Sequence, residues 1–325
     1  MEKAKAFFIC ILVVLSVSSC SGQAPAEGQS TVCVATWNVQ NLFNAVLDGA
    51  EYDEYKPSSG WNESMYKRRL SNAAKVLSCL PEAREYVIVL NEIEGPDVAE
   101  GLLFQQEMRK LGLHWYACTS NEGSPIQSAV VSSLPVTGAR IHEVDGELRP
   151  VLEVELEAAG EKIFIFAVHF KSNVGGTAQT QEARTLAASV VNRIAQTVAL
   201  ENPGALMLVC GDLNDECWEN RTLGRDGEIK VSGTFSWDSW YCFWMDEGLT
   251  FWPQGSYFYG GSWKSYDNIL VSQSGGDNSG LEFMGAGVVF EGIIRTADSK
   301  PFAWNRDLLS GVSDHLPVWI LLGGP

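Results

Sequence analysis

Ionisable and amide side chains stand at the ends of strand-like segments along this sequence. Asp314 and His315 lie directly before an apolar run, Leu-Pro-Val-Trp-Ile, at 316–320. A single Asp–His pair is common in turns and by itself implies no chemistry. The same residue types recur at the ends of five other strand-like segments, as Asn38, Glu92, His169, Asp212 with Asn214, and Asp267. Together, these acids, amides and imidazoles predict a site where strand ends converge.

These side chains meet the needs of phosphate-ester hydrolysis. That reaction requires a positioned water, neutralisation of the developing negative charge and assistance to the leaving oxygen. A carboxylate such as Asp212 can position or deprotonate the water. A metal together with His169 and His315 can neutralise charge, and amide groups can orient the phosphate. The set therefore predicts metal-assisted phosphoester hydrolysis.

Strand and helix patterns alternate along the chain and supply the elements that would position these residues. Apolar, β-rich runs predict strands over 32–38, 86–93, 151–156, 162–170, 205–212, 267–272 and 315–322. Several of them are continuously apolar, as expected for strands that are covered on both faces. Helical periodicity covers 64–80, with Lys67, Arg68, Arg69 and Lys75 on its charged face, and 179–200. No repeat or Pro/Gly-rich linker divides 31–325, which we interpret as one layered α/β domain.

Composition restricts the class of substrate. The chain has 325 residues, of which 46% are hydrophobic, so it can bury a large core. Its formal net charge is -17, which argues against a broad basic surface for long duplex DNA. Phosphate chemistry in such a protein would need a metal cation to supply positive charge locally.

The N-terminal segment resembles a secretory signal. Lysines at positions 3 and 5 precede an apolar run over 7–17 that is too short to span a bilayer as a mature helix. Val-Ser-Ser-Cys at 17–20 resembles a bacterial lipobox, which predicts a signal peptide over 1–19, lipidation of Cys20 and a polar tether over 20–30. The alternative is an ordinary signal with an incidental cysteine. We expect an exported protein, lipid-anchored to the bacterial cell envelope and touching the membrane only through that anchor.

The remaining cysteines give little functional information. None of those at 33, 79, 118, 210, 217 and 242 belongs to a CxxC pair, which argues against a zinc cluster. Cys33 and Cys210 fall inside apolar runs and are interpreted as small core residues. The sequence leaves the disulfide pairing open.

Six motifs in order resemble the endonuclease/exonuclease/phosphatase superfamily, the deoxyribonuclease-I-like proteins. They are TWNVQNL (36–42), LNEIE (90–94), HFKS (169–172), GDLND (211–215), YDNIL (266–270) and SDHLPV (313–318). The resemblance covers 32–322, and GDLN with SDHLP is its most specific pair. It implies a four-layer α-β-β-α sandwich of two mixed β-sheets flanked by helices, with the active site at one edge.

The resemblance also implies roles for individual residues. Metal-site positions are Glu92, Asn38 and Asp314, and catalytic positions are His169, Asp212, Asn214, Asp267 and His315. Asp212 would activate the water, Asp267 would orient His315, and His169 would stabilise the transition state or help the leaving group. The implied cofactor is Mg²⁺, with Mn²⁺ or Ca²⁺ as alternatives. Gln40 replaces an acid that many relatives carry, which favours one metal over two.

Four further residues are predicted to contact substrate: Lys171, Arg184, Tyr259 and Trp263. For Lys171 and Arg184 the alternatives are a solvated loop and a helix-surface arginine. Tyr259 and Trp263 belong to an aromatic stretch at 235–263, which either stacks on a ligand or packs against the core.

Three functions remain open from the sequence. The first is an exported nuclease or phosphodiesterase that acts on short or single-stranded nucleic acid. The second is a phosphatase or phosphodiesterase of phospholipid headgroups or sugar phosphates, because the same constellation serves both. The third is a catalytically inactive binding lipoprotein. We predict no protein partner and expect a monomer.

Overall fold

The computed structural model describes residues 30–49, 51–120, 124–145, 148–217 and 230–324. The predicted signal peptide, Cys20 and the tether up to residue 29 lie outside the described residues. Within the described part of the chain, no helix is both long and apolar enough to cross a bilayer.

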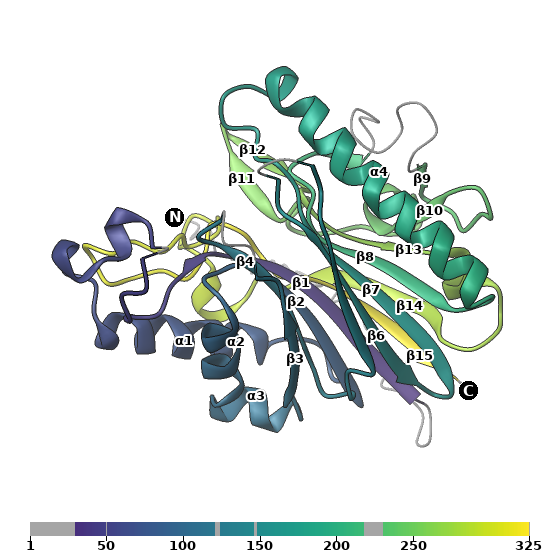
Figure 1. Ribbon diagram of the computed structural model, residues 1–325, viewed down its shortest axis with the longest axis horizontal. Helices are drawn as coiled ribbons and strands as arrows, with labels where there is room; N and C mark the ends of the chain where they lie inside the picture. The colour runs from purple at the N-terminus through teal and green to yellow at the C-terminus, as the bar shows by residue number, and fades with distance from the viewer. Residues whose placement is uncertain (1–29, 50, 121–123, 146–147, 218–229, 325) are drawn as a thin grey trace, which may run out of the picture.

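Two mixed β-sheets form the centre of the molecule (Figure 1). The six-stranded sheet has the order β14-β15-β1-β2-β4-β3. Its strands are β1 (Ser30–Leu42), β2 (Glu85–Ile93), β3 (Trp115–Cys118), β4 (Gln127–Ser132), β14 (Glu282–Val288) and β15 (Val318–Gly324). In this sheet β1 is parallel to β2 and antiparallel to β15.

The seven-stranded sheet has the order β5-β6-β7-β8-β13-β10-β9. Its strands are β5 (Gly138–His142), β6 (Val151–Ala158), β7 (Glu161–His169), β8 (Leu206–Asp212), β9 (Val231–Ser232), β10 (Trp240–Cys242) and β13 (Asp267–Val271). Strand β8 is parallel to β7 and antiparallel to β13. A separate two-stranded hairpin consists of β11 (Tyr257–Tyr259) and β12 (Ser262–Lys264).

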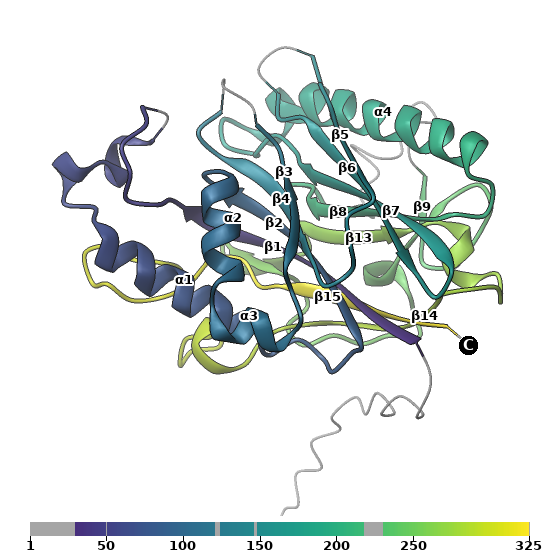
Figure 2. The ribbon, with the colours of Figure 1, turned by 60° about the horizontal axis from the view of Figure 1, so that its bottom comes forward.

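Helices cover the outer faces of both sheets, as Figures 1 and 2 show from two directions. Helices α1, α2 and α3 pack on the six-stranded sheet, and α4 packs on the other. Their bounds are α1 (Glu63–Leu77), α2 (Pro96–Leu103), α3 (Gln106–Lys110) and α4 (Thr177–Glu201). The fold is therefore the predicted α-β-β-α sandwich.

Alternation along the strands explains why the molecule has layers. In β1, Cys33 and Ala35 face the helices, whereas Val32 and Val34 face the second sheet. Successive side chains of a strand point to opposite faces, so an apolar residue at every position buries both faces. Cys33 and Cys210 are core residues, as predicted, and the cysteines among the described residues carry free thiols.

The seven predicted strands and both predicted helices are present, whereas the sequence did not predict β3, β4, β5, β9, β10, β11, β12, β14, α2 and α3. Both predicted helices occur within three residues of the expected bounds, and the first starts after Asn62, whose side chain accepts hydrogen bonds from Ser64 N and Met65 N. The last strand begins only at Val318 rather than at 315. Pro317 has no N–H to donate, so His315 lies before the strand and forms an isolated bridge with Tyr257.

Candidate active site

Strand register brings the predicted site residues to one edge of the sandwich. His169 pairs with Asp212 across the parallel strands β7 and β8, and Asp212 pairs with Asp267 across β8 and β13. In the other sheet, Asn38 pairs with Asn91, next to Glu92. Sequence positions from 38 to 315 therefore meet where these strands end or begin.

A local distortion of the backbone directs the Glu92 side chain toward this site. Its φ is +63°, and the pairing of both β1 and β2 with their neighbours shifts register here, as in β-bulges that redirect a side chain. Glu92 Oε1 accepts a hydrogen bond from Asn38 Nδ2 at 2.8 Å, and Oε2 accepts one from Asn41 N at 3.0 Å. The carboxylate is held by two donors and keeps 19% of its side chain exposed.

Arg69 of α1 holds this distorted end of β1. Its guanidinium donates to the carbonyl oxygens of Gln40 and Asn41, each at 2.8 Å, and only 3% of the residue is exposed. The prediction of a solvent-exposed charged helix face is wrong for Arg69, because unpaired carbonyls of the bulge need donors. The Gln40 side chain accepts a hydrogen bond from Trp304 N at 2.7 Å, which gives it a structural partner.

Asp212 lies at the centre of the hydrogen-bond network. Its Oδ2 accepts from Asn38 Nδ2 at 3.1 Å, and its Oδ1 accepts from Asn214 N at 2.8 Å in a tight turn. The preceding residue, Gly211, has φ +151°, and a Cβ at this position would collide with the carbonyl oxygen of Val168. Glycine thus allows β8 to approach β7 closely just before Asp212.

His315 is oriented by Asp267. Its Nδ1 lies 2.7 Å from Asp267 Oδ2, and its Nε2 lies 4.0 Å from Asp212 Oδ2. Burial lowers the pKa of His315, but the charge of Asp267 and its hydrogen bond, with Asp212 and Asp314, outweigh this and raise the pKa well above its usual value. The neighbouring carboxylates therefore stabilise the protonated form of the imidazole.

His169 has the opposite electrostatic character. Its Nε2 lies 3.7 Å from Glu92 Oε1 and 3.8 Å from Asp212 Oδ2, and 4% of the residue is exposed. Burial, followed by the charges of Arg149 and His315, lowers the pKa of His169 well below its usual value. Its Nδ1 is buried without a hydrogen-bond partner. A neutral imidazole can donate a proton from one nitrogen and accept one at the other.

The donor set fits a divalent cation. Burial raises the pKa of Asp212 to about 7, and it also raises that of Glu92, with Asp314 adding to the rise. Carboxylates that are crowded and dry in this way gain most from a bound positive charge. Glu92 and Asp314 offer oxygen ligands, as Mg²⁺ prefers, and a single accessible carboxylate with waters and a phosphate suffices for that ion. Asn38 turns its Nδ2 to the carboxylates, and its Oδ1 accepts a hydrogen bond from Gln40 N at 3.0 Å, so a metal would share that oxygen with the backbone.

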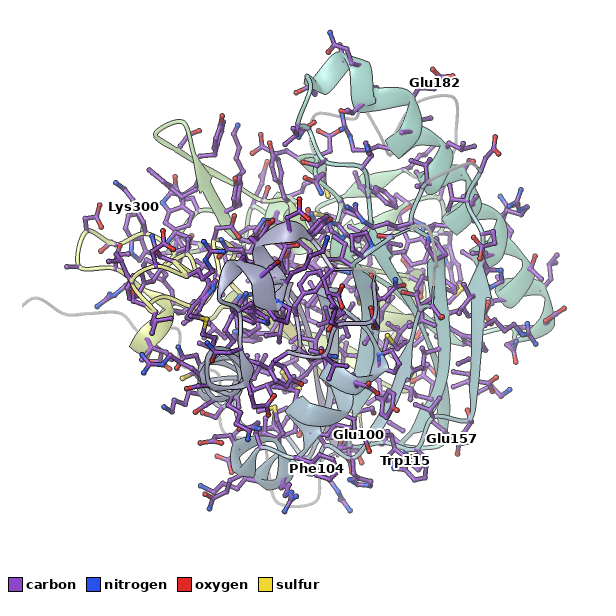
Figure 3. The ribbon with its side chains drawn as sticks, turned by 60° about the vertical axis from the view of Figure 1, so that its left-hand side comes forward. Glu100, Phe104, Trp115, Glu157, Glu182 and Lys300 are labelled. Carbon is purple, nitrogen blue, oxygen red and sulfur yellow. The ribbon has the colours of Figure 1, made fainter. Side chains whose placement is uncertain are left out.

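Asp314 and Lys171 have open side chains near the site. Asp314 is half-buried, and its charge raises the pKa of both Glu92 and His315. Lys171 is exposed and lines a cavity of about 70 Å³ together with His169 and Arg149. In contrast, the charged residues labelled in Figure 3, Glu100, Glu157, Glu182 and Lys300, lie at the outside of the molecule.

Sequence reasoning did not identify Arg149, which belongs to the site. Arg149 lies two residues before the start of β6, and its Nη1 donates to Phe170 O at 3.2 Å. Its Nε is buried without a hydrogen-bond partner, and its charge acts on both His169 and Glu92. A lone arginine before a strand belongs to no motif. Its position in the site becomes visible only in the structure, where β6 pairs with β7.

The predicted substrate contact of Arg184 is contradicted by its position. Its side chain is fully buried, and Nη1 donates to Thr180 Oγ1 at 2.7 Å and to Lys171 O at 3.3 Å. Nη2 donates to Thr177 O at 3.0 Å. Arg184 therefore fixes the loop between β7 and α4 and does not reach a substrate. The predicted contact had rested on the family resemblance, because relatives often carry a basic residue near this position.

The two remaining predicted substrate contacts, Tyr259 and Trp263, lie on opposite faces of the β11–β12 hairpin. Tyr259 is 69% exposed and lies parallel to Tyr257, which stacks on His315. Trp263 points to the other face, where it packs against Phe258 and Phe290. Trp263 is half-buried and makes packing contacts, and its substrate contact stays a prediction.

A profile described as the Endonuclease/Exonuclease/phosphatase family matches residues 33–323. Among solved structures, truncated TDP2 of Caenorhabditis elegans is 19% identical, with a TM-score of 0.51 over 90% of this chain and 97% of that chain. An endonuclease/exonuclease/phosphatase family protein of Bacteroides thetaiotaomicron is 13% identical, with a TM-score of 0.51 over 91% and 99%. Beta toxin of Staphylococcus aureus is 16% identical, with a TM-score of 0.52 over 89% and 98%. A search of curated protein sequences found no match. At these identities the likeness establishes the fold.

Proposed function

Because this chain belongs to the Endonuclease/Exonuclease/phosphatase family, we propose that it is a metal-dependent hydrolase of phosphodiester bonds. The observation that supports this most strongly is the Asn38 amide. Its Nδ2 donates to Glu92 at 2.8 Å and to Asp212 at 3.1 Å, and so joins the metal-binding carboxylate to the water-activating one. A phosphate bound beside Asn38 would lie next to both Glu92, with its metal, and Asp212, with its water.

The residues of the site can perform the reaction in order. A divalent cation held by Glu92, with Asn38 and Asp314, would supply Lewis-acid charge for the phosphate oxygens. Asp212 accepts the proton of the attacking water, a role suited to a carboxylate whose pKa is raised to about 7. Asn214 positions the phosphate beside it. His315, kept protonated by Asp267, donates hydrogen bonds to the charge that develops on the phosphate.

The opposite wall of the site would serve the leaving group. His169 and Arg149 line the same small cavity, and both carry a buried nitrogen with no hydrogen-bond partner. An ester oxygen placed in this cavity would satisfy one of those nitrogens. Arg149 and Lys171 also supply positive charge for a flanking phosphate.

We propose short or single-stranded nucleic acid as the substrate, consistent with the net charge of -17 and the few cations at the site. The test is hydrolysis of single-stranded DNA, RNA, plasmid, bis(p-nitrophenyl) phosphate, p-nitrophenyl phosphate and sphingomyelin, each with Mg²⁺ or EDTA. We expect metal-dependent turnover of diesters. Monoester or sphingomyelin turnover alone would support the second function, and a folded protein inactive on every substrate would contradict the proposal.

Export and lipid anchoring are a separate part of the proposal, and they rest on the N-terminal sequence alone. Lipidation of Cys20 would place the enzyme at the bacterial envelope. Palmitate labelling of the full chain and of Cys20→Ser tests this in a bacterial host. Label in both proteins, or in neither, would contradict the anchor.

A further inference from the structure

The β11–β12 hairpin has two chemically different faces. Side chains alternate between the faces of a strand, so Tyr257 and Tyr259 share one face while Phe258 lies on the other. Across the hairpin, Phe258 pairs with Trp263, and Tyr257 pairs with Lys264. The aromatic residues of this short element are therefore sorted by position.

The inner face packs against the rest of the protein, and its two aromatic residues are half-buried. Phe258 and Trp263 meet edge-to-face with ring centroids 5.3 Å apart, and Trp263 meets Phe290 in the same way at 5.7 Å. Lys300 Nζ lies 5.2 Å from the Phe258 ring centroid. These rings have protein partners and explain how the hairpin is attached to the core.

The outer face of the hairpin forms a row of aromatic rings that begins at His315 and runs toward the solvent. The Tyr257 ring stacks on the His315 imidazole with centroids 4.5 Å apart, and it lies parallel to the Tyr259 ring, within 8°, at 6.2 Å. Tyr266 is stacked against Tyr257 at 5.7 Å. Flat rings thus extend from a catalytic imidazole to Tyr259, which is 69% exposed.

Backbone hydrogen bonds fix this surface to the catalytic segments. Leu316 N, next to His315, donates to Ser256 O at 2.8 Å, and Ser256 N donates to Lys264 O at 2.9 Å. Asp267 N donates to Ser256 Oγ at 3.1 Å. A rigid, exposed aromatic face beside the reacting group is preorganised for a flat ligand.

We propose that the Tyr257–Tyr259 face binds a nucleobase of single-stranded nucleic acid, next to the phosphate that is cleaved. This rests on the proposed function and names its recognition element. Stacking on aromatic rings is tolerant of base identity and needs no extra positive charge. It therefore supplies affinity in a protein of net charge -17, where electrostatic binding to a long phosphate backbone is weak.

The hairpin tip favours this ligand over a membrane. Tyr259 is followed by Gly260, Gly261 and Ser262, so the tip offers no aliphatic side chain to insert among lipid chains. A phenol ring flanked by glycines presents an open face to a flat ligand. A nucleotide has a flat base that can stack on Tyr259, and the sugar holds that base at a limited distance from the phosphate.

The test compares ligands with and without a base. Calorimetry on Asp212→Asn, which prevents hydrolysis, measures the affinity for thymidine 5′-monophosphate and for 2-deoxyribose 5-phosphate in Mg²⁺. We expect the nucleotide to bind about tenfold more tightly. Adding Tyr259→Leu should bring the two affinities together, whereas Tyr259→Phe, which retains the ring, should preserve the difference. Trp237→Leu removes a ring that is 83% exposed but outside the hairpin, and should change nothing.

Equal affinity for the two ligands before the Tyr259 substitution, or an unchanged ratio after Tyr259→Leu, would overturn the inference. Binding to phosphatidylcholine vesicles that disappears in Tyr259→Leu would also overturn it, by assigning the face to lipid. Metal-dependent diester hydrolysis is measured separately on the native sequence. If hydrolysis persists without base preference, the proposed function stands and only this inference fails.

Discussion

The two ends of strand β8 carry hollows of very different character. At the Leu206 end, a cavity of about 620 Å³ is lined by alanines, Trp237, Trp240, neutral amides and serines, with Lys230 and Asp238 paired at 3.7 Å. At the Asp212 end, a cavity of about 70 Å³ is lined by the buried His169 together with Arg149 and Lys171. The smaller cavity thus has an excess of basic side chains, whereas the charges of the larger one are paired.

The difference teaches that buried, closely spaced ionisable groups distinguish the candidate active site better than cavity volume does. Burying carboxylates beside one another costs free energy, and a fold that only had to pack its core would avoid it. Ionisable groups with strongly shifted pKa values therefore cluster at functional sites. The large cavity contains no group of this kind among its lining residues. Substitutions at the two ends of β8 should therefore have unequal effects.

Asp212→Asn should have the largest effect. The amide cannot accept the proton of water, so kcat on bis(p-nitrophenyl) phosphate should fall by at least about a hundredfold. Circular dichroism should show an intact fold, because Asn214 N can still donate to the new side-chain oxygen. Retention of more than a tenth of the activity would remove Asp212 from the role of base.

Glu92→Gln should weaken the response to metal. A neutral amide is a poor ligand for a hard cation, so the Mg²⁺ concentration for half-maximal rate should rise about tenfold or more. Glu161→Gln is the matched control, because Glu161 is half-buried at a strand start and bonds Leu281 N. An equal shift in both variants would indicate a general loss of charge rather than of a ligand.

Asp267→Asn should change the pH profile. Asp267 raises the pKa of His315, so its removal leaves burial to lower that pKa, and the protonated form is lost at lower pH. The descending limb of the rate profile should move to lower pH by about one unit or more. An unchanged limb would show that His315 need not be protonated.

Stability should oppose activity at Asp212. The pKa of Asp212 is about 7 in the folded protein, above the usual value of 3.8. Its contribution to stability is therefore fully present below pH 3.8 and is lost as the pH rises from 3.8 to 7, because the carboxyl group ionises more readily in the unfolded chain. In EDTA at pH 8, Asp212→Asn should therefore have a higher Tm than the native sequence, and the gap should narrow at pH 5. A lower Tm for the variant at pH 8 would contradict this assignment of charge strain.

Substitution in the large cavity should have the smallest effect. Gln196→Ala removes a neutral amide of α4 from the lining of this cavity, which lies at the end of β8 opposite to Asp212. We expect kcat and KM to stay within about twofold of the native values, because surface changes away from special features are usually small. A tenfold loss would show that the two ends of β8 are coupled.

Local sequence specified the strands and helices because their bounds follow from periodicity and caps. Alternation of core faces in β1 and the Asn62 cap of α1 are visible in the residues themselves. The strands β3, β5 and β14 were not predicted, because their partly exposed residues show weaker patterns. The very short strands β9 to β12 were also missed, as was β4, although β4 is buried at every position. The acids and imidazoles at strand ends were identified because strand ends in a sandwich share an edge.

The sequence by itself determined which residue types reach the active edge, since strand length and order place Asn38, Asp212 and Asp267 there. Only the tertiary structure decided which cations face the substrate: Arg149 enters the site, whereas Arg184 is buried beneath a loop. The hairpin likewise directs Tyr259 outward and Trp263 inward. The physical reason is that a side chain's type is local, whereas its burial and partners depend on segments far away in the chain.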